Sequence, residues 1–321
     1  MSTASHERDV LIEVVIPNWN GLKVLPRTLE SLARQTFSEF RVTVVDNGSR
    51  DGSREYVRMQ WPHLRVLALP RNVGFCRAVN EGIRKSPADL IALLNNDAEA
   101  EPGWLEALCE AAERYPQAGS FASKILMAGS RECIESAGDW IKPDACGVNR
   151  GRGEVDKGQY DQEEEVFSAS AAAALYRRKL FEKVGLFDEG FFAYFEDIDL
   201  GFRAQRFGAS CIYVPHARVF HQGKTSRPED RCWHLQQEFV NSTLCQVKNL
   251  PTRYFARNYR SICLSHLRSI MGLIKEGGPR VLFASEWAVV LRLPRVLVIR
   301  ALLWRASRGR FDRLAFFLPP S

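Results

Sequence analysis

The sequence predicts an open α/β sheet with helices on both faces. Two observations support this fold class: short apolar runs that do not alternate with polar residues, and helical repeats between them. The apolar runs predict strands at 10–16, 41–45, 64–69, 89–94 and 208–214. Helices are expected between the first four strands, over 22–35, from Ser53 and over 74–85.

Each of the early elements has its own signal. The first strand is β-branched and ends at Pro17, and leucines then recur at the helical period from Leu22 to Leu32. The second strand ends in Asp-Asn-Gly-Ser from Asp46, which is the chemistry of a turn. The strand at 89–94 runs into a third polar cluster, Asn95–Asp97.

Polar clusters follow three of these strands, at 18–20, 46–49 and 95–97. Ligands of open α/β sheets bind outside the carboxyl ends of the strands. The three clusters therefore predict one binding site at this edge of the sheet. No G-x-G-x-x-G turn follows the first strand and no G-x-x-x-x-G-K-[ST] loop is present, which disfavours a dinucleotide-binding dehydrogenase and a P-loop enzyme.

Two later stretches differ from this alternation. The glycine-rich stretch 128–165 is predicted to be irregular. Residues 281–304 are strongly apolar but interrupted by charges, so no run approaches the roughly 18 residues that a spanning helix needs. Arginines among tryptophan and leucine are typical of a helix lying in a membrane interface. We expect residues 281–321 to contact a membrane surface; an amphipathic helix packed on the core is the alternative.

The composition is ordinary for a soluble globular protein. Of 321 residues, 45% are apolar and 26% are charged, and the formal net charge is +6. Residues 251–321 alone carry +10, so a negatively charged partner should meet the tail. Eight scattered cysteines without a C-x-x-C pair argue against a zinc site and a disulfide framework. The polar N-terminus lacks an apolar signal core, so a cytoplasmic location is expected.

The segment 190–203 places three carboxylates, Glu196, Asp197 and Asp199, directly behind four aromatic side chains. Carboxylates beside apolar surface are costly to desolvate, and their pKa values can rise, which suits a general base. Acids that complement a helix N-terminus are the alternative interpretation.

Seven segments together resemble the family 2 glycosyltransferases, most closely their rhamnosyltransferase-like branch. In chain order they are Val14–Gly21, Val44–Gly52, Arg71–Phe75, Leu93–Asp97, Gly185–Asp188, Phe195–Asp197 and His221–Ser226. The likeness covers roughly residues 10–250. It implies a GT-A fold, a Rossmann-like mixed open sheet flanked by helices. Residues 10–100 would form a nucleotide-binding half and 101–250 an acceptor-binding half, with 251–321 an amphipathic helical extension.

The resemblance implies inverting transfer of a sugar, with rhamnose preferred, from a dTDP- or UDP-sugar to a lipid-linked or polysaccharide hydroxyl in cell-envelope glycan synthesis. Asp46 would accept the imide N–H of the base, and Pro17 and Trp19 would shape the base and ribose pocket. A turn at Asp46 and a buried ring at Trp19 are the structural alternatives. Further nucleotide-binding residues implied by the family are Asn47, Arg71, Asn72, Gly74 and Asn96.

The same resemblance implies a Mg²⁺ or Mn²⁺ site. Asn95–Asp97 stands where the family has D-x-D, with Asp97 the expected ligand and Asn95 a weaker or outer-shell one. His221, in an H-x-x-G-x-S pattern, would be a further ligand. Ser170-Ala171 departs from the family's usual Gly-Ala pair, which bears on the donor-sugar pocket.

For catalysis, the resemblance makes Asp197 the base that takes the acceptor proton, with Glu196 contacting the acceptor or orienting the base. Asp199 is expected to cap the following helix. The alternatives are a nucleotidyltransferase, which leaves Asp197 without a task, and a non-catalytic anion- or nucleic-acid-binding protein that uses the arginine-rich tail. The tail lacks the stacking arrangement of single-strand readers, so no nucleic-acid partner is expected.

Overall fold

The structure is a computed structural model that describes residues 12–223, 231–307 and 312–318. Two sequence expectations, the first two residues of the opening strand and Ser226, lie outside these residues. The strands are β1 Ile12–Asn18, β2 Phe40–Asp46, β3 Arg65–Ala68, β4 Leu90–Leu94, β5 Ala98–Ala100, β6 Ala118–Met127, β7 Ser130–Ala137, β8 Asp139–Ile141, β9 Gly147–Asn149, β10 Glu164–Val166, β11 Ala173–Arg177 and β12 Ser210–His221.

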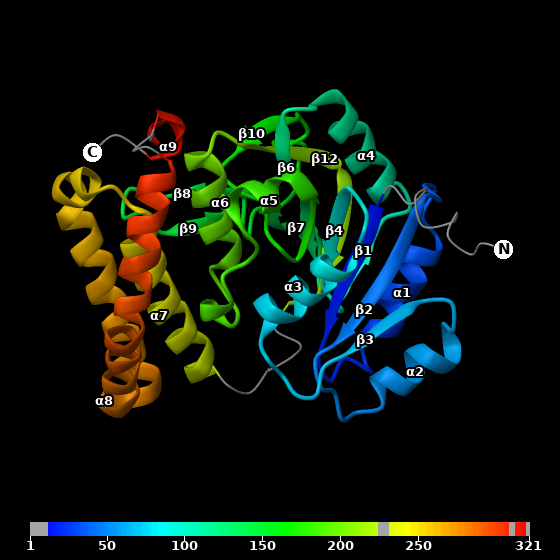
Figure 1. The fold of residues 1–321 in the computed structure, drawn as a ribbon, viewed down its shortest axis with the longest axis horizontal. Helices are drawn as coiled ribbons and strands as arrows, with labels where there is room; N and C mark the ends of the chain where they lie inside the picture. Colours follow the sequence, from blue (N-terminus) through cyan, green and yellow to red (C-terminus); the bar gives the residue numbers. More distant parts are fainter. Residues whose placement is uncertain (1–11, 224–230, 308–311, 319–321) are drawn as a thin grey trace.

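A mixed sheet runs through the molecule, with helices on both faces (Figure 1). Its strands lie in the order β10-β12-β6-β11-β4-β1-β2-β3, with β5 paired to β12 and β7 paired to β6. The four N-terminal strands pair in parallel, whereas β11 runs antiparallel to β4 and β6. The α/β class predicted from the sequence is confirmed.

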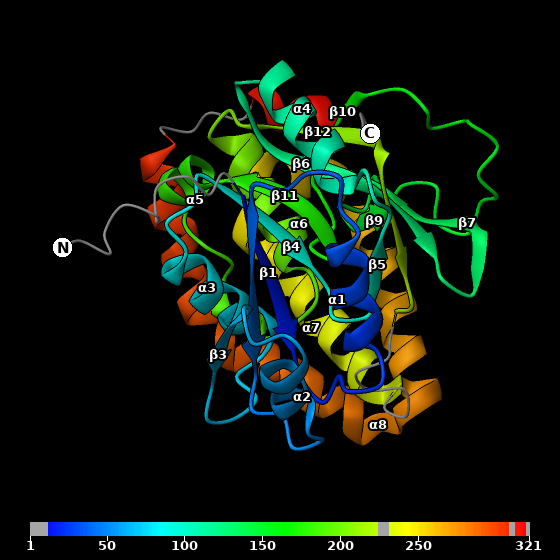
Figure 2. The same cartoon turned by 90° about the vertical axis from the view of Figure 1, so that its right-hand side faces the viewer.

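Nine helices are described: α1 Leu25–Ala33, α2 Ser53–Gln60, α3 Phe75–Lys85, α4 Trp104–Arg114, α5 Arg178–Val184, α6 Glu196–Arg206, α7 Arg231–Asn249, α8 Thr252–Ala306 and α9 Asp312–Phe317. Two apolar clusters cover the sheet. One joins it to α1, α2 and α4, and the other to α3, α5, α6 and the C-terminal helices. The β1–β3 strands and the C-terminal helices lie at opposite ends of the molecule (Figure 1), so the strands are in front and these helices behind in Figure 2.

Two parts of the chain are more regular than the sequence predicts. The stretch 128–165 is only partly irregular: it contains β7, β8, β9 and the start of β10, whereas residues 150–163 form turns and loops. Its strands are short, and glycines with positive φ at 138, 151 and 153 interrupt the pattern. The strand expected at 208–214 extends as β12 to His221, because a register shift between Val214 and Arg218 lets it pair again with β6.

Helix α8 is two arms joined at Gly278, whose φ of 73° departs from helical geometry. Pro279 starts the second arm, where its missing N–H is tolerated. The arms run antiparallel, because His266 lies 3.7 Å from Glu286 and Arg300 lies 3.3 Å from Thr252. No described helix is both long and apolar enough to cross a membrane.

Candidate active site

A cavity of about 1300 Å³ opens where β1, β2 and β4 end. The described residues on its wall include ten that the sequence analysis predicted: Pro17, Trp19, Asn47, Asn72, Asn95, Asn96, Asp97, Glu196, Asp197 and His221. The structure therefore brings the strand-end clusters and the segment 190–203 together. Three further predicted residues, Asp46, Arg71 and Gly74, are not among the described residues that line it.

Side-chain amides tie the strand ends to one another. Asn96 donates to Asn18 Oδ1 at 2.8 Å, and Asn18 donates to Ser53 at the start of α2 at 2.9 Å. Asn47 donates to Asn72 Oδ1 at 3.0 Å. These bonds hold the loops after three strands in one arrangement, so this wall of the cavity is preorganised.

Asp46, the last residue of β2, lies behind this wall. Its side chain is fully buried, and neither carboxylate oxygen has a hydrogen-bond partner among the described residues. An unpartnered buried carboxylate is strongly unfavourable, so natural structures keep one mainly where a ligand supplies the donor. Gly74 stands nearby with a φ of 90°, and a Cβ there would lie 2.7 Å from Phe192. Only glycine lets these two segments approach so closely.

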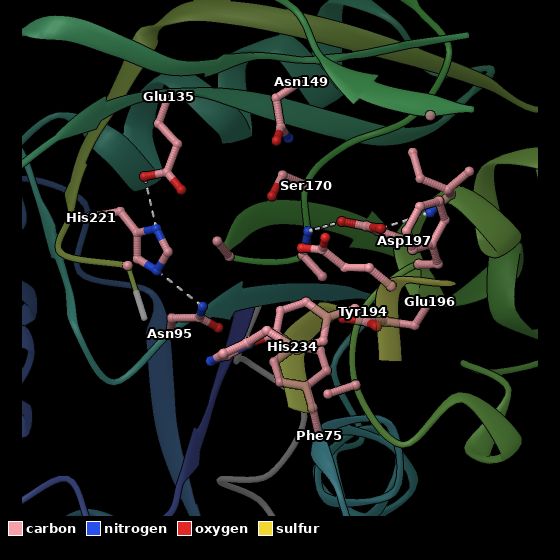
Figure 3. A pocket seen from close by; sticks show the side chains of 18 of the residues that line it. Phe75, Asn95, Glu135, Asn149, Ser170, Tyr194, Glu196, Asp197, His221 and His234 are labelled. Atoms are coloured by element: carbon pink, nitrogen blue, oxygen red, sulfur yellow. Dashed lines mark hydrogen bonds and ion pairs between the residues drawn. The ribbon is translucent and has the colours of Figure 1, made fainter. Parts of the chain in front are cut away.

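His221 lies between two carboxylates, Asp97 and Glu135, at the end of β12. Figure 3 shows its ring between Glu135 and Asn95. Its Nε2 is 3.1 Å from Asp97 Oδ1, and its Nδ1 is 2.9 Å from Glu135 Oε2. The same Nε2 lies 3.2 Å from Asn95 Nδ2. Burial disfavours a charged imidazole, but the two carboxylates outweigh it and raise the pKa of His221 to about 10.

This cluster fits a divalent cation whose other coordination positions are filled by a bound ligand. Glu135 occupies one ring nitrogen of His221 and leaves the other beside Asp97, which is the arrangement of a metal-binding histidine and its supporting carboxylate. No three His, Cys, Asp or Glu side chains converge to hold an ion among the residues described. A cation at Asp97 and His221 would thus need further oxygen ligands from outside the protein.

Three acids lie on the other side of the cavity: Asp139 and Glu196 are buried, and Asp197 is half-buried. Asp197 accepts from the backbone N–H groups of Ile198 at 2.8 Å and Ala171 at 3.3 Å. Burial raises its pKa despite these bonds. Burial and the neighbouring charge of Asp197 raise the pKa of Glu196 to about 8. Asp139 is almost completely buried, and the same two causes raise its pKa well above the usual range.

The loop that leads to Asp197 is strained. Phe192, Tyr194 and Phe195 have φ values of 64°, 73° and 68°, a region that costs non-glycine residues roughly 1–3 kcal/mol each. Asn241 on α7 opposes this cost, because its amide donates to the carbonyls of Phe191, Ala193 and Tyr194 at 2.8–2.9 Å. Strain that the surrounding structure holds in place is typical of active sites.

Asp199 does not cap the helix that follows, so that prediction is wrong. Phe195 is the N-cap residue of α6, and Asp199 lies one turn inside the helix. Its carboxylate accepts from Arg203 at 2.9 Å and from Lys248 on α7 at 2.9 Å. Because Asp199 lies on α6 and Lys248 on α7, their ion pair holds the two helices together. All three charged side chains are buried.

Comparison with known proteins agrees with this geometry. The family model "Glycosyl transferase family 2" matches residues 13–185. The chain belongs to glycosyltransferase family 2. It is 30% identical over 252 residues to the N-acetylglucosaminyl-diphospho-decaprenol L-rhamnosyltransferase of Mycobacterium tuberculosis, covering 70% of this chain and 80% of that one. The rhamnosyltransferase-like branch indicated by the sequence is thereby confirmed.

Two solved structures share the fold. S. aureus TarS 1-349 in complex with UDP-GlcNAc has a TM-score of 0.57 at 18% identity, over 96% of this chain and 90% of that one. This chain spans about half of a longer TarS chain, 54%. The mannosyltransferase PcManGT of Pyrobaculum calidifontis, solved with GDP-Man and Mn2+, has a TM-score of 0.51 at 15% identity, over 94% and 87%. The family 2 glycosyltransferase therefore has the expected GT-A fold.

Three residues of this site were missed by sequence reasoning: Glu135, Asp139 and Asn241. The first two lie in the stretch predicted to be irregular, where no hydrophobic period marks which residues point inward. Asn241 sits in a long helix with no motif around it. Only the tertiary fold brings these side chains to the site.

Proposed function

We propose that this glycosyltransferase transfers a sugar, with rhamnose preferred, from a dTDP- or UDP-sugar to a hydroxyl of a lipid-linked or polysaccharide acceptor, with inversion. The observation that carries the proposal is that one cavity extends from Asn47, the neighbour of the buried and unpartnered Asp46 among the described residues, to Asp197. The named activity of the mycobacterial relative supports rhamnose, an N-acetylglucosaminyl-diphospho-lipid acceptor and a place in cell-envelope glycan synthesis.

The chain's residues divide the work between binding and proton transfer. Asp46 accepts the imide N–H of uracil or thymine, which supplies the partner that its carboxylate lacks. The acceptor oxygen attacks C1 of the donor sugar as Asp197 takes its proton. The bond from C1 to the diphosphate oxygen breaks, and the nucleoside diphosphate leaves. The raised pKa of Asp197 makes it a stronger base than a solvated carboxylate.

We further propose that Asp97 and His221 hold Mg²⁺ or Mn²⁺ with the donor diphosphate, with Asn95 in a supporting position. The bond from Glu135 to His221 supports this, because it orients the ring. A bound cation would stabilise the negative charge that develops on the leaving diphosphate.

Attachment to a membrane at the cytoplasmic face, through residues 281–321, is part of the same proposal. The second arm of α8 carries large apolar side chains on its exposed side: Phe283, Trp287, Val290, Leu291, Leu297, Val298 and Leu302. Exposed arginines at 280, 295 and 305 accompany them. Apolar and basic groups on one helix suit the surface of an anionic bilayer.

A thermal shift series tests the donor and metal assignments. Purified protein is heated with dTDP, UDP, GDP or ADP, each with and without Mn²⁺. A ligand at 100 times its dissociation constant should add about 2.7 kcal/mol of stability. We expect Mn²⁺-dependent stabilisation by dTDP or UDP that Asp97→Ala abolishes. Stabilisation by GDP or ADP alone would reject the donor class, and equal stabilisation without Mn²⁺ would reject the metal.

A further inference from the structure

The cavity has two walls of different chemistry. At the strand ends it is lined by amides, carboxylates and an imidazole, among them Asn47, Asp97 and His221. Across from these, the wall is largely aromatic and aliphatic and comes from the segment around α6 and from α7 and α8. Asp197 lies on this second side, opposite the His221 cluster (Figure 3).

Helices α7 and α8 contribute the C-terminal residues of this second wall. The apolar Trp233, Leu235 and Phe239 and the polar His234, Glu238 and Ser242 come from α7, while Ser269 and Leu273 come from the first arm of α8. Phe239 and Leu273 are almost completely buried, so this lining is part of the packed interior. The first arm of α8 therefore has a role at the cavity as well as at the surface.

The same arm is apolar on its outside. Leu264, Leu267, Met271 and Ile274 are exposed, and Met271 is 61% exposed although Leu273 is only 2% exposed. These side chains lie outside the range 281–321 that the sequence marked for membrane contact. One helical arm thus carries both an apolar exterior and the end of the cavity.

We infer that the α7–α8 wall is the acceptor subsite and that it holds the apolar chain of an amphipathic acceptor whose hydroxyl reaches Asp197. This rests on the proposed function. The polar wall is suited to a charged nucleotide and cannot offer an apolar chain a favourable surface. The apolar wall can, because it removes such a chain from water. The exposed face of the same arm would let the chain pass from a bilayer to the cavity along apolar surface.

Kinetics with two acceptors test the subsite. N-acetylglucosaminyl diphosphate is esterified with either an ethyl group or a phytanyl chain. Transfer is measured in one nonionic detergent, where attachment to a bilayer plays no part. Ser269→Trp narrows the cavity from α8, and Ser242→Phe narrows it from α7. Ser261→Trp is the matched control, since Ser261 is an exposed serine on the same arm that does not line the cavity.

We expect the KM ratio of phytanyl to ethyl acceptor to rise about tenfold in both cavity variants, because a bulky ring there excludes the chain. Ser261→Trp should keep the wild-type ratio. A ratio unchanged in both cavity variants, with KM for the donor at the wild-type value, would overturn the subsite while leaving the proposed function intact. Absence of transfer by the wild-type protein to either acceptor would overturn the proposed function, and the subsite with it.

Discussion

The two sides of the cavity are built by different means. On the donor side, amide side chains at the strand ends donate to Asn18, Ser53 and Asn72 over 2.8–3.0 Å. Positive φ falls there on Asn20 and on glycines 48, 52 and 74, residue types that adopt it at low cost. On the catalytic side, the aromatic residues Phe192, Tyr194 and Phe195 have positive φ. Desolvation there raises the pKa values of three acids, Asp139, Glu196 and Asp197. The donor side is preorganised for binding at little cost in stability. The catalytic side, by contrast, holds strained backbone and desolvated acids, both of unfavourable free energy, next to the reacting atoms.

This difference separates binding from chemistry. Changes on the catalytic side should alter turnover and the response to pH, and changes on the donor side should alter nucleotide affinity. A variant that changed both in proportion would contradict the separation.

The largest effect is expected from Asp197→Asn. An amide cannot take the acceptor proton, so kcat should fall about 10³-fold, within the range of general base catalysis. Nucleotide binding should stay near the wild-type value, because the bonds that Asp197 makes to described residues go to the backbone of Ile198 and Ala171, on its own side of the cavity. Initial rates and a thermal shift with the nucleotide measure the two quantities. Normal turnover would remove Asp197 from the role of base.

The second expected effect is the pH dependence of stability set by Glu196. Its pKa rises from 4.5 to about 8 on folding, so its contribution to stability is present at acidic pH and is lost as pH rises through the folded value. The loss should be on the order of a few kcal/mol, since one pKa unit corresponds to about 1.4 kcal/mol.

Glu196→Gln should remove this loss, because glutamine does not ionise. Urea unfolding of both proteins at several values between about pH 5 and pH 9 gives the comparison. Parallel pH profiles of the two proteins would mean that Glu196 is not the group that holds the proton.

The donor side was largely predictable from the sequence, and the catalytic side only in part. Strand ends carry their polar clusters within a few residues, so the positions of Asn47 and Asp97 follow from local patterns and sheet topology. Glu135 and Asn241 reach the site from β7 and α7, through pairing and packing that no local pattern encodes.

The division of the chain at residue 250 stays a prediction, and α8 begins close to it, at Thr252.

The next effect is expected from Asp46→Asn, on the donor side. Replacing the carboxylate should weaken dTDP or UDP binding about 10- to 100-fold, as expected for loss of a hydrogen bond to a charged group. Folding stability should not fall, because the carboxylate has no partner among the described residues. Asp51→Asn is the matched control. Asp51 accepts from Leu22 and Ser53, so its loss should lower stability and spare nucleotide affinity. Unchanged affinity in Asp46→Asn, measured by titration calorimetry, would show that the base binds elsewhere.

The smallest effect is expected from Asn241→Ala, and it tests whether the strained loop serves catalysis. Without the amide, the carbonyls of Phe191, Ala193 and Tyr194 lose their common donor, and the loop can relax. We expect kcat to fall about tenfold with KM for the donor unchanged, since a misplaced catalytic group lowers turnover.

Asn249→Ala is the control for Asn241→Ala, because Asn249 is an equally buried asparagine on α7 that bonds Asp199 instead of the loop. Both variants should lose stability to a similar degree, on the order of 1–3 kcal/mol for a buried polar network that is broken. Only Asn241→Ala should also lower kcat. If both lowered kcat equally, α7 would act as general support for the fold. If only Asn241→Ala did, the free energy stored in the loop would be part of what holds Asp197 in place.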